Sequence, residues 1–475
     1  MSRLLGDART ATTSEIAEHT RGGASGGLYL GRHYDPAEGP TEAITYREDR
    51  HLIVFGPTGS GKTKRFLVPN LTLGLEEESV IVIDPKGELA AMTADHRRSL
   101  GHEVVVLNPF NVLGLGSAGF NPMAALDRKS PDFYDDAAAI GEALIRVEGN
   151  EPHWSESAQG LMTALLMWEK RVHANGASLE NVRAMLTEAD SWAETSGPDG
   201  RRPQIAGLAI TARKMVRDGG YEIASLAGRF TDRTNEIASI QSTADTQTRW
   251  MLSPPMREDL AKDGIDFRSL KERPTTVYVV LPAERLRTHS VWLRLVIVSA
   301  LRALYRPGGR RTLFLIDEMA ALGHLAPLED AFGLVRGYGI QIAAIFQDLP
   351  QLKGLYKERW ETFIANAGVV FGFAPNDLTT AEWMSKRSGQ TTVVAKSYNE
   401  NRSSSTGGQG SESSGSGASD QQIARPLFLP HELFGMEPGI GLLWLAGLDS
   451  TSLMFLPYYA RIALCETRVK ASPYG

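Results

Sequence analysis

The chain has 475 residues, enough for two or three domains, and its 42% hydrophobic and 22% charged content is ordinary for a globular protein. A formal net charge of −6 excludes a uniformly basic nucleic-acid-binding protein, although a basic lining inside a ring or groove is still compatible with it. Because Cys465 is the only cysteine, an intrachain disulfide is excluded, and a reducing, intracellular location fits.

Residues 1–50 have a mixed composition, which predicts an opening segment or a small sheet extension. After them, buried strands alternate with helical patterns. The expected order is strand 51–55, a glycine-rich turn, a helix from about Lys62 that is kinked by Pro69, strand 79–83, a helix opened by Asp84 and Pro85, and strand 103–107. Strand, helix and strand at this spacing indicate a parallel sheet.

The pattern then changes, because residues 130–252 contain no convincing strand. Helices are expected at 133–147, 153–173, 179–188, 203–217 and 236–251. This stretch is interpreted as an all-α domain of residues 130–252, inserted into an α/β domain that comprises residues 1–129 and 253–475.

The α/β pattern returns after the insertion. Strands are expected at 275–281, 312–316, 340–346, 369–373, 440–446 and 452–456, and helices at 290–305, 327–336, 359–365 and 377–388. The serine- and glycine-rich stretch 401–420 is expected to be a flexible insertion without a packed element. The predicted fold class is α/β, with a mostly parallel twisted sheet that has helices on both faces.

A phosphate-binding pattern, G-x-x-x-x-G-K-[ST], follows the first buried strand. It is formed by Gly56, Pro57, Thr58, Gly59, Ser60, Gly61, Lys62 and Thr63. The glycines let backbone N–H groups point at phosphate oxygens, Lys62 adds a positive charge for the β- and γ-phosphates, and the Thr63 hydroxyl is a Mg²⁺ ligand. The alternative is a glycine-rich surface turn with a solvated lysine. A strand before the pattern and a helix after it favour a P-loop ATPase that binds ATP and Mg²⁺.

A second acidic half of the site is expected where strand 312–316 ends, at Asp317 and Glu318. Ligand sites in parallel sheets lie at the carboxyl ends of strands. Asp317 can hold Mg²⁺ through its water shell there, and Glu318 can activate the attacking water. The alternative is a helix cap at Asp317 followed by a solvated Glu318.

Three further segments are candidates for the same site. Gln347 ends strand 340–346; in P-loop ATPases with a catalytic glutamate, such a strand lies between the P-loop strand and the acidic strand, and its terminal polar residue senses the γ-phosphate. Arg336 is either a favourable helix-terminal arginine or an arginine finger for a neighbouring subunit. The motif Asp84-Pro85-Lys86-Gly87-Glu88 is a well-capped helix start, and a direct role for it is left open.

Together these motifs resemble the TraG/TraD-like coupling ATPases of type IV secretion and bacterial conjugation. The likeness covers nearly the whole chain. The matching pieces are 56–63, Ile83 to Leu89, Ile316-Asp317-Glu318 with Leu322-Gly323, 336–340, Gln347-Asp348, Arg425-Pro426-Leu427 and Pro430-His431-Glu432-Leu433.

The resemblance implies a RecA-like motor domain interrupted by an all-α domain, and a homo-hexameric ring at the cytoplasmic side of the bacterial inner membrane. It also implies partners: relaxase-bound single-stranded DNA, protein effectors or both as cargo, and the inner-membrane components of the secretion system. ATP hydrolysis at subunit interfaces would then drive delivery to the secretion channel.

Members of this family usually begin with a transmembrane segment, whereas this sequence has no stretch of about 18 uninterrupted apolar residues. Leu4 to Arg9 resembles the stretch that follows the anchor. The expectation is either a fragment or a naturally anchorless member. In either case the isolated chain is expected to be monomeric and to have weak ATPase activity, because Arg336 would lack a neighbouring subunit to act on.

Two other functions are compatible with the motifs. One is a DNA translocase of the segregation-pump type, which the all-α insertion at 130–252 argues against. The other is a substrate-receptor module that uses nucleotide for assembly, which would bind ATP without hydrolysing it.

Overall fold

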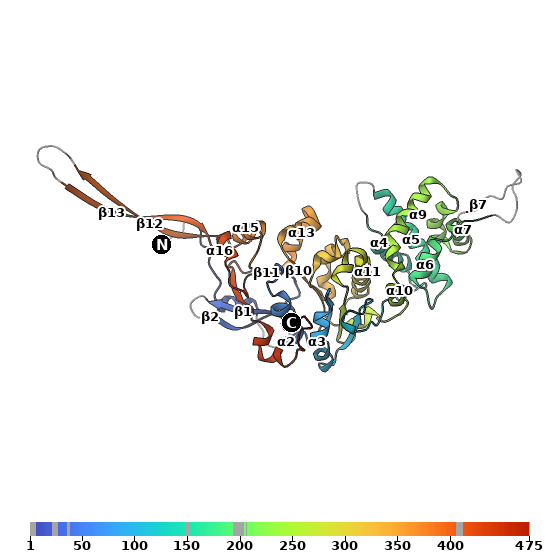
Figure 1. The fold of residues 1–475 in the computed structure, drawn as a ribbon, viewed down its shortest axis with the longest axis horizontal. Helices are drawn as coiled ribbons and strands as arrows, with labels where there is room; N and C mark the ends of the chain where they lie inside the picture. The colour runs from blue at the N-terminus through green and yellow to red at the C-terminus, as the bar shows by residue number, and fades with distance from the viewer. Residues whose placement is uncertain are drawn as a thin grey trace.

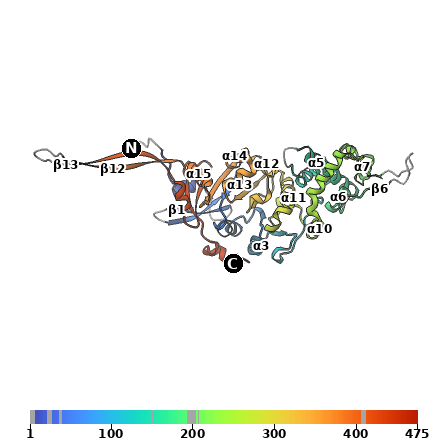
Figure 2. The ribbon, with the colours of Figure 1, turned by 45° about the horizontal axis from the view of Figure 1, so that its top comes forward.

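The computed structural model describes residues 6–20, 27–35, 39–147, 152–192, 204–205, 207–404 and 412–474. The molecule is elongated, with an α/β body in the middle, a lobe of helices at one end and a long β-hairpin at the other (Figure 1). A view turned by 45° keeps the three parts in the same order (Figure 2). Within the described ranges, no helix is both long and apolar enough to cross a bilayer.

The body is built on an 11-stranded sheet with the order β2-β1-β15-β14-β11-β3-β10-β9-β4-β8-β5. The strands from β11 to β5 run parallel, whereas β14, β15, β1 and β2 extend the sheet in antiparallel pairs. The bounds are β1 Leu28–Asp35, β2 Gly39–Tyr46, β3 His51–Phe55, β4 Ser79–Ile83, β5 Glu103–Leu107, β8 Thr275–Val279, β9 Thr312–Ile316, β10 Ile340–Phe346, β11 Ala367–Phe373, β14 Ile440–Leu445 and β15 Ser452–Phe455.

Two separate cores pack on the two faces of this sheet. Along β3, Ile53 and Phe55 belong to one core, and Leu52 and Val54 belong to the other. This follows from the two-residue period of a strand, and burial of both faces is typical of parallel strands that lie between helices. The helices of the body are α2 Val68–Leu73, α3 Glu88–Ser99, α11 Leu286–Leu304, α12 Ala326–Leu334, α13 Leu349–Tyr356, α14 Trp360–Asn366, α15 Leu378–Arg387, α16 Pro430–Phe434 and α17 Ala463–Glu466.

Helix α13 was not predicted from the sequence, and neither were the short helices α16 and α17. Asp348 caps α13 by accepting a 2.8 Å hydrogen bond from the Gln351 backbone N–H. Pro350 lies in the first turn of α13, where proline is well tolerated because its missing N–H would have no partner anyway.

The lobe consists of helices that surround α5 Pro152–Val172, which packs against α4, α6, α8 and α9. The other helices are α4 Phe133–Leu144, α6 Leu179–Leu186, α7 Gly207–Asp218, α8 Tyr221–Ala227, α9 Asn235–Thr248 and α10 Pro254–Leu260. The expectation of no strand here is wrong in one detail, because Ser191–Trp192 (β6) pairs with Gln204–Ile205 (β7). Helices α8 and α10 were also not predicted.

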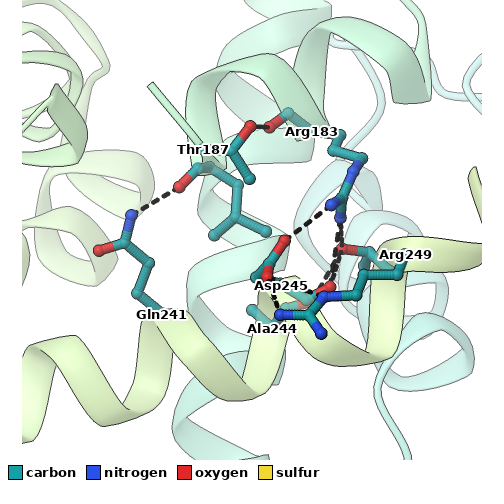
Figure 3. Close-up of polar contacts among 8 residues, drawn as sticks. Arg183, Thr187, Gln241, Ala244, Asp245 and Arg249 are labelled. Atoms are coloured by element: carbon teal, nitrogen blue, oxygen red, sulfur yellow. Dashed lines mark hydrogen bonds and ion pairs between the residues drawn. The ribbon is translucent and has the colours of Figure 1, made fainter. Parts of the chain in front are cut away.

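A buried arginine ties α6 to α9 in this lobe (Figure 3). Arg183 is only 8% exposed, and its guanidinium lies 2.7 Å from the Asp245 carboxylate. Asp245 also pairs with Arg249 at 2.8 Å, one turn further along the chain. Because a buried charge without a partner is costly, this pairing fixes how the two helices pack.

The long hairpin corrects the prediction for residues 401–420. Strands β12 Gln390–Ser404 and β13 Glu412–Pro426 pair continuously from Gln390 opposite Pro426 to Ser404 opposite Glu412. Residues 405–411 lie outside the described residues. Serine and glycine offer little side-chain packing, and that is why no element was expected, but backbone pairing does not depend on packing.

A small sheet extension had been one of the two expectations for residues 1–50, and it is confirmed, because β1 and β2 join the sheet through β15. They are preceded by α1 Thr13–His19, which Thr12 caps. The segment before α1 reaches the base of the hairpin, where Ala8 N–H donates to the Gln390 carbonyl at 2.9 Å.

Candidate active site

The phosphate-binding pattern forms a tight loop directly after β3. Gly59 and Gly61 both have a φ of 85°, which side chains disfavour. A Cβ on Gly56 would lie 2.9 Å from the side chains of Lys62 and Phe373, so this position has no room for one. The glycines of the pattern are therefore required by the shape of the loop.

Lys62 folds back over this loop. Its ammonium donates to the carbonyls of Gly56 at 2.6 Å and Pro57 at 3.3 Å. Burial lowers the pKa of Lys62, while the carboxylates of Asp317 and Glu318 act in the opposite direction. The two halves of the predicted site are thus close enough to interact electrostatically.

A helix follows the loop, as expected, but it begins unusually. Thr63–Leu67 forms a π-helical turn that continues into α2, and Pro69 lies in the first turn of α2. A kink in the middle of this helix had been predicted at Pro69. The structure shows a change from π-helix to α-helix just before the proline. The start of this helix points its backbone N–H groups towards the loop, which favours an anion there.

The acidic residues lie at the same edge of the sheet as the loop. Ala343 of β10 pairs with Leu52 of β3 on one side and with Leu315 of β9 on the other. Strand β10 therefore lies between the loop strand and the acidic strand, as the sequence predicted. Burial raises the pKa of Asp317 to about 6; Lys62 counteracts this effect and Glu318 adds to it.

Glu318 is held by two glutamines. Gln347 donates from Nε2 to Glu318 Oε2 at 2.9 Å, and Gln351 donates to the other oxygen at 3.4 Å. Gln351 also accepts a 2.9 Å hydrogen bond from the Gln347 backbone N–H. Sequence reasoning missed Gln351, although Asp348 followed three residues later by a glutamine is a capping pattern that marks the start of a helix.

The 84–88 motif lies beside this site. The prediction that a helix begins at Asp84 is wrong. Helix α3 begins at Glu88, after Gly87 with a φ of 68°. Asp84 still caps it from a distance, because its carboxylate accepts a 2.9 Å hydrogen bond from the Ala90 backbone N–H. Burial raises the pKa of Asp84 to about 7, and the nearby Asp317 contributes to the rise.

Arg336 is not brought to this site within the chain. Its Nε lies 2.6 Å from Asp49 Oδ1. Asp49 precedes β3 and Arg336 precedes β10, so both lie at the sheet edge opposite the loop. Five residues of β3 at about 3.3 Å each put the two edges roughly 17 Å apart.

Comparison with known proteins gives a consistent picture. A family model described as "Type IV secretory system Conjugative DNA transfer" matches residues 7–471. The chain is 29% identical over 449 residues to a conjugal transfer protein TraG of Agrobacterium fabrum, covering 87% of this chain and 64% of that protein. It is 27% identical over 418 residues to the type IV secretion system-coupling protein VirD4 of Bartonella quintana, covering 83% of this chain and 61% of VirD4. The chain thus spans less than two thirds of the length of these relatives.

Among solved structures, the chain is similar to the bacterial conjugative coupling protein TrwB, with a TM-score of 0.65, 18% identity and coverage of 96% of this chain and 93% of that one. TrwB in complex with a non-hydrolysable ATP analogue gives a TM-score of 0.66 at 18% identity, covering 96% of this chain and 95% of that chain. At this identity the likeness concerns the fold, and it confirms the predicted α/β fold of the RecA-like P-loop type.

Proposed function

The chain belongs to the type IV secretory system conjugative DNA transfer family, and from this premise we propose that it is an ATP-hydrolysing coupling protein. The observation that carries the proposal is the meeting of two segments at one edge of the sheet. The loop with Lys62 and the carboxylates of Asp317 and Glu318 lie close enough to shift the pKa of Lys62. Such an arrangement suits a nucleoside triphosphate with its metal ion.

In this proposal the loop 56–63 binds the phosphates of ATP through backbone N–H groups and Lys62. The Thr63 hydroxyl and, through water, Asp317 would hold Mg²⁺, which neutralises charge on the phosphates. The oxygen donors of a hydroxyl and a carboxylate suit this hard cation. The related coupling protein TrwB has been solved with ADP and Mg²⁺, which supports the assignment of both cofactors.

Glu318 is proposed as the base that orients and deprotonates the attacking water. Two glutamine amides donate hydrogen bonds to its carboxylate and fix its position. Gln347 lies between this base and the loop strand, so it can report the presence of the γ-phosphate to β10. Gln351 is proposed as a positioning residue for both.

Arg336 is proposed to act on the nucleotide of a neighbouring copy. Its place at the opposite sheet edge leaves it unable to reach the loop of its own chain, whereas a ring places opposite surfaces of adjacent subunits against each other. A homo-hexamer is the assembly proposed for this chain, with the isolated chain as a monomer of low activity. In that ring the Arg336 guanidinium would leave its ion pair with Asp49 and bind the γ-phosphate held by the neighbouring subunit.

The proposed cargo is relaxase-bound single-stranded DNA, protein effectors or both, delivered at the cytoplasmic side of the bacterial inner membrane to inner-membrane components of a type IV secretion system. Support comes from the family and from relatives named for conjugal transfer and for type IV secretion coupling. Each of these partners is a proposal for this chain.

Turnover of ATP tests the proposal directly. Purified chain is assayed for ATP hydrolysis over a range of concentrations, with and without single-stranded DNA, and its assembly is followed in parallel by analytical ultracentrifugation. The expected result is a specific activity that rises with assembly. ATP binding without turnover under every condition, assembled rings included, would refute the motor and favour the receptor function.

A further inference from the structure

The loop 84–88 runs along the proposed nucleotide site, yet the mechanism above gives it no role. Strand β4 pairs with β9, and Ile83 lies opposite Ile316. Asp84 and Asp317 therefore leave the sheet next to each other at the same edge, on strands about 4.8 Å apart. Two residues later the exposed side chain of Lys86 follows.

The charge of Lys86 reaches both halves of the site. It lowers the pKa of Asp317 and it lowers the pKa of Lys62, in both cases as a smaller effect than burial. Within the described ranges of the chain, no ion pair involves the Lys86 ammonium. An exposed lysine beside a phosphate loop, without a carboxylate partner of its own, is available to an anionic ligand.

The backbone that carries Lys86 is fixed from within the loop. The Gly87 N–H donates to the Asp84 carbonyl at 3.1 Å, and the Asp84 side chain accepts from Ala90. Asp84 is only 2% exposed, so this turn is anchored in the sheet and not in solvent. The loop is therefore rigid enough to present a side chain in a defined direction.

A distant segment of the chain holds the same loop from outside. The Tyr474 hydroxyl donates to the carbonyl of Lys86 at 2.9 Å. Two residues earlier, the Ser472 hydroxyl donates to the Glu88 carboxylate at 2.6 Å. These contacts link residues nearly at the end of the described chain to the edge where the nucleotide is proposed to bind.

We propose that Lys86 is a second phosphate-binding cation that recognises the terminal phosphate of a bound nucleoside triphosphate, and that Tyr474 positions it. This inference rests on the proposed function. A γ-phosphate adds negative charge that ADP lacks, so a cation at this place favours the triphosphate over the diphosphate. In the proposed function Lys62, in contrast, also contacts the β-phosphate, so its loss would weaken the binding of both nucleotides.

The test compares the affinities of the full chain for a non-hydrolysable ATP analogue and for ADP, both with Mg²⁺, by isothermal titration calorimetry. Lys86→Ala is expected to weaken binding of the analogue by about tenfold while ADP affinity stays nearly unchanged. Lys86→Arg, which keeps the charge, is expected to retain most of the preference. Lys214→Ala is the matched control, because Lys214 is an exposed lysine on α7 in the helical lobe.

Tyr474→Phe removes only the hydroxyl that holds the Lys86 carbonyl. A decrease of about two- to threefold in the preference for the analogue is expected, and no further decrease when the change is made in Lys86→Ala. A purely structural role of Tyr474 would instead lower stability equally in both backgrounds and leave the preference for the analogue intact.

The outcomes separate the inference from the function on which it rests. Wild-type chain that prefers the analogue, together with Lys86→Ala that has lost this preference, supports the inference. A Lys86→Ala chain that keeps the wild-type preference, or a wild-type chain that binds both nucleotides equally, overturns it while nucleotide binding stands. Wild-type chain that binds neither nucleotide overturns the proposed function itself.

Discussion

The side-chain amide of Gln347 donates a 2.9 Å hydrogen bond to the carboxylate of Glu318, and this bond joins the ends of β10 and β9. The two residues are 29 positions apart in the sequence but lie on neighbouring parallel strands. A proposed water-activating base is thereby coupled to the strand that separates it from the phosphate loop.

The first prediction concerns this pair. Gln347→Ala is expected to lower kcat by about 10- to 100-fold with little change in nucleotide affinity, because the base loses its orientation and not its charge. Steady-state kinetics on assembled protein provides the measurement. Gln341→Ala on the same strand, whose amide contacts the backbone at the opposite edge, is the control and is expected to retain kcat.

Glu318→Gln is expected to keep ATP binding and to lose hydrolysis by at least about 100-fold, because the amide cannot accept a proton. Trapping of radiolabelled ATP on the filter-bound variant, followed by chromatography of the nucleotide, measures both properties at once. Recovery of ADP at the wild-type rate would remove Glu318 from the mechanism.

Lys62→Ala is expected to weaken binding of both ATP and ADP by about tenfold or more, because the phosphates lose a partly buried charge. Fluorescent-nucleotide titration is the measurement, with Lys214→Ala as the control. Equal affinity in Lys62→Ala and in the control would contradict the assignment of the loop 56–63.

Mixing experiments test whether Arg336 acts across a subunit interface. Arg336→Ala and Lys62→Ala are each expected to be inactive, yet a mixture should recover part of the activity, since a Lys62→Ala subunit can supply Arg336 to the intact loop of its neighbour. Activity is measured against the mixing ratio. Because solvent screens the exposed Arg336–Asp49 ion pair, Arg336→Ala should unfold at nearly the wild-type urea concentration.

The buried carboxyl of Asp84 predicts a pH dependence of stability. Its folded-state pKa of about 7 lies above the ordinary value of 3.8, so the folded chain binds the proton more tightly than the unfolded chain. Stability from this group is therefore present at low pH and is lost as the pH rises from about 4 to about 7. Asp84→Asn keeps the hydrogen bond to Ala90 and removes the titration. The variant should thus gain stability relative to wild type between pH 5 and pH 8, measured as the urea midpoint; a constant difference would contradict the prediction.

Much of the fold could be predicted because buried parallel strands are short apolar runs with clear ends. The bounds expected for 51–55, 79–83, 103–107, 312–316 and 340–346 are those of β3, β4, β5, β9 and β10. Because ligand sites of such sheets lie at the carboxyl ends of strands, the positions of the proposed site residues Lys62, Asp317 and Gln347 could be predicted from the strands.

The features that could not be predicted depend on contacts between residues far apart in the sequence or on backbone pairing, which the local pattern of apolar and polar residues does not encode. The partner of Arg336 is Asp49, far away in sequence, and the second glutamine on Glu318 is reached only because α13 folds back over the sheet edge. The β12–β13 hairpin is stabilised by its own backbone ladder, which composition-based reasoning does not detect. Hydrophobic periodicity reports burial, so elements and contacts that bury little apolar surface are missed.

The short N-terminal segment before α1 has a mechanical consequence. Ala8 is bonded to Gln390 at the base of the hairpin, and Ala11 donates to the Thr451 carbonyl next to β15, both at 2.9 Å. Strands β14 and β11 separate β15 from β3. Tension applied to this end of the chain would therefore act first on the base of the hairpin and on the antiparallel strand β15. It would reach β3, the strand that carries the phosphate loop, only through β14 and β11.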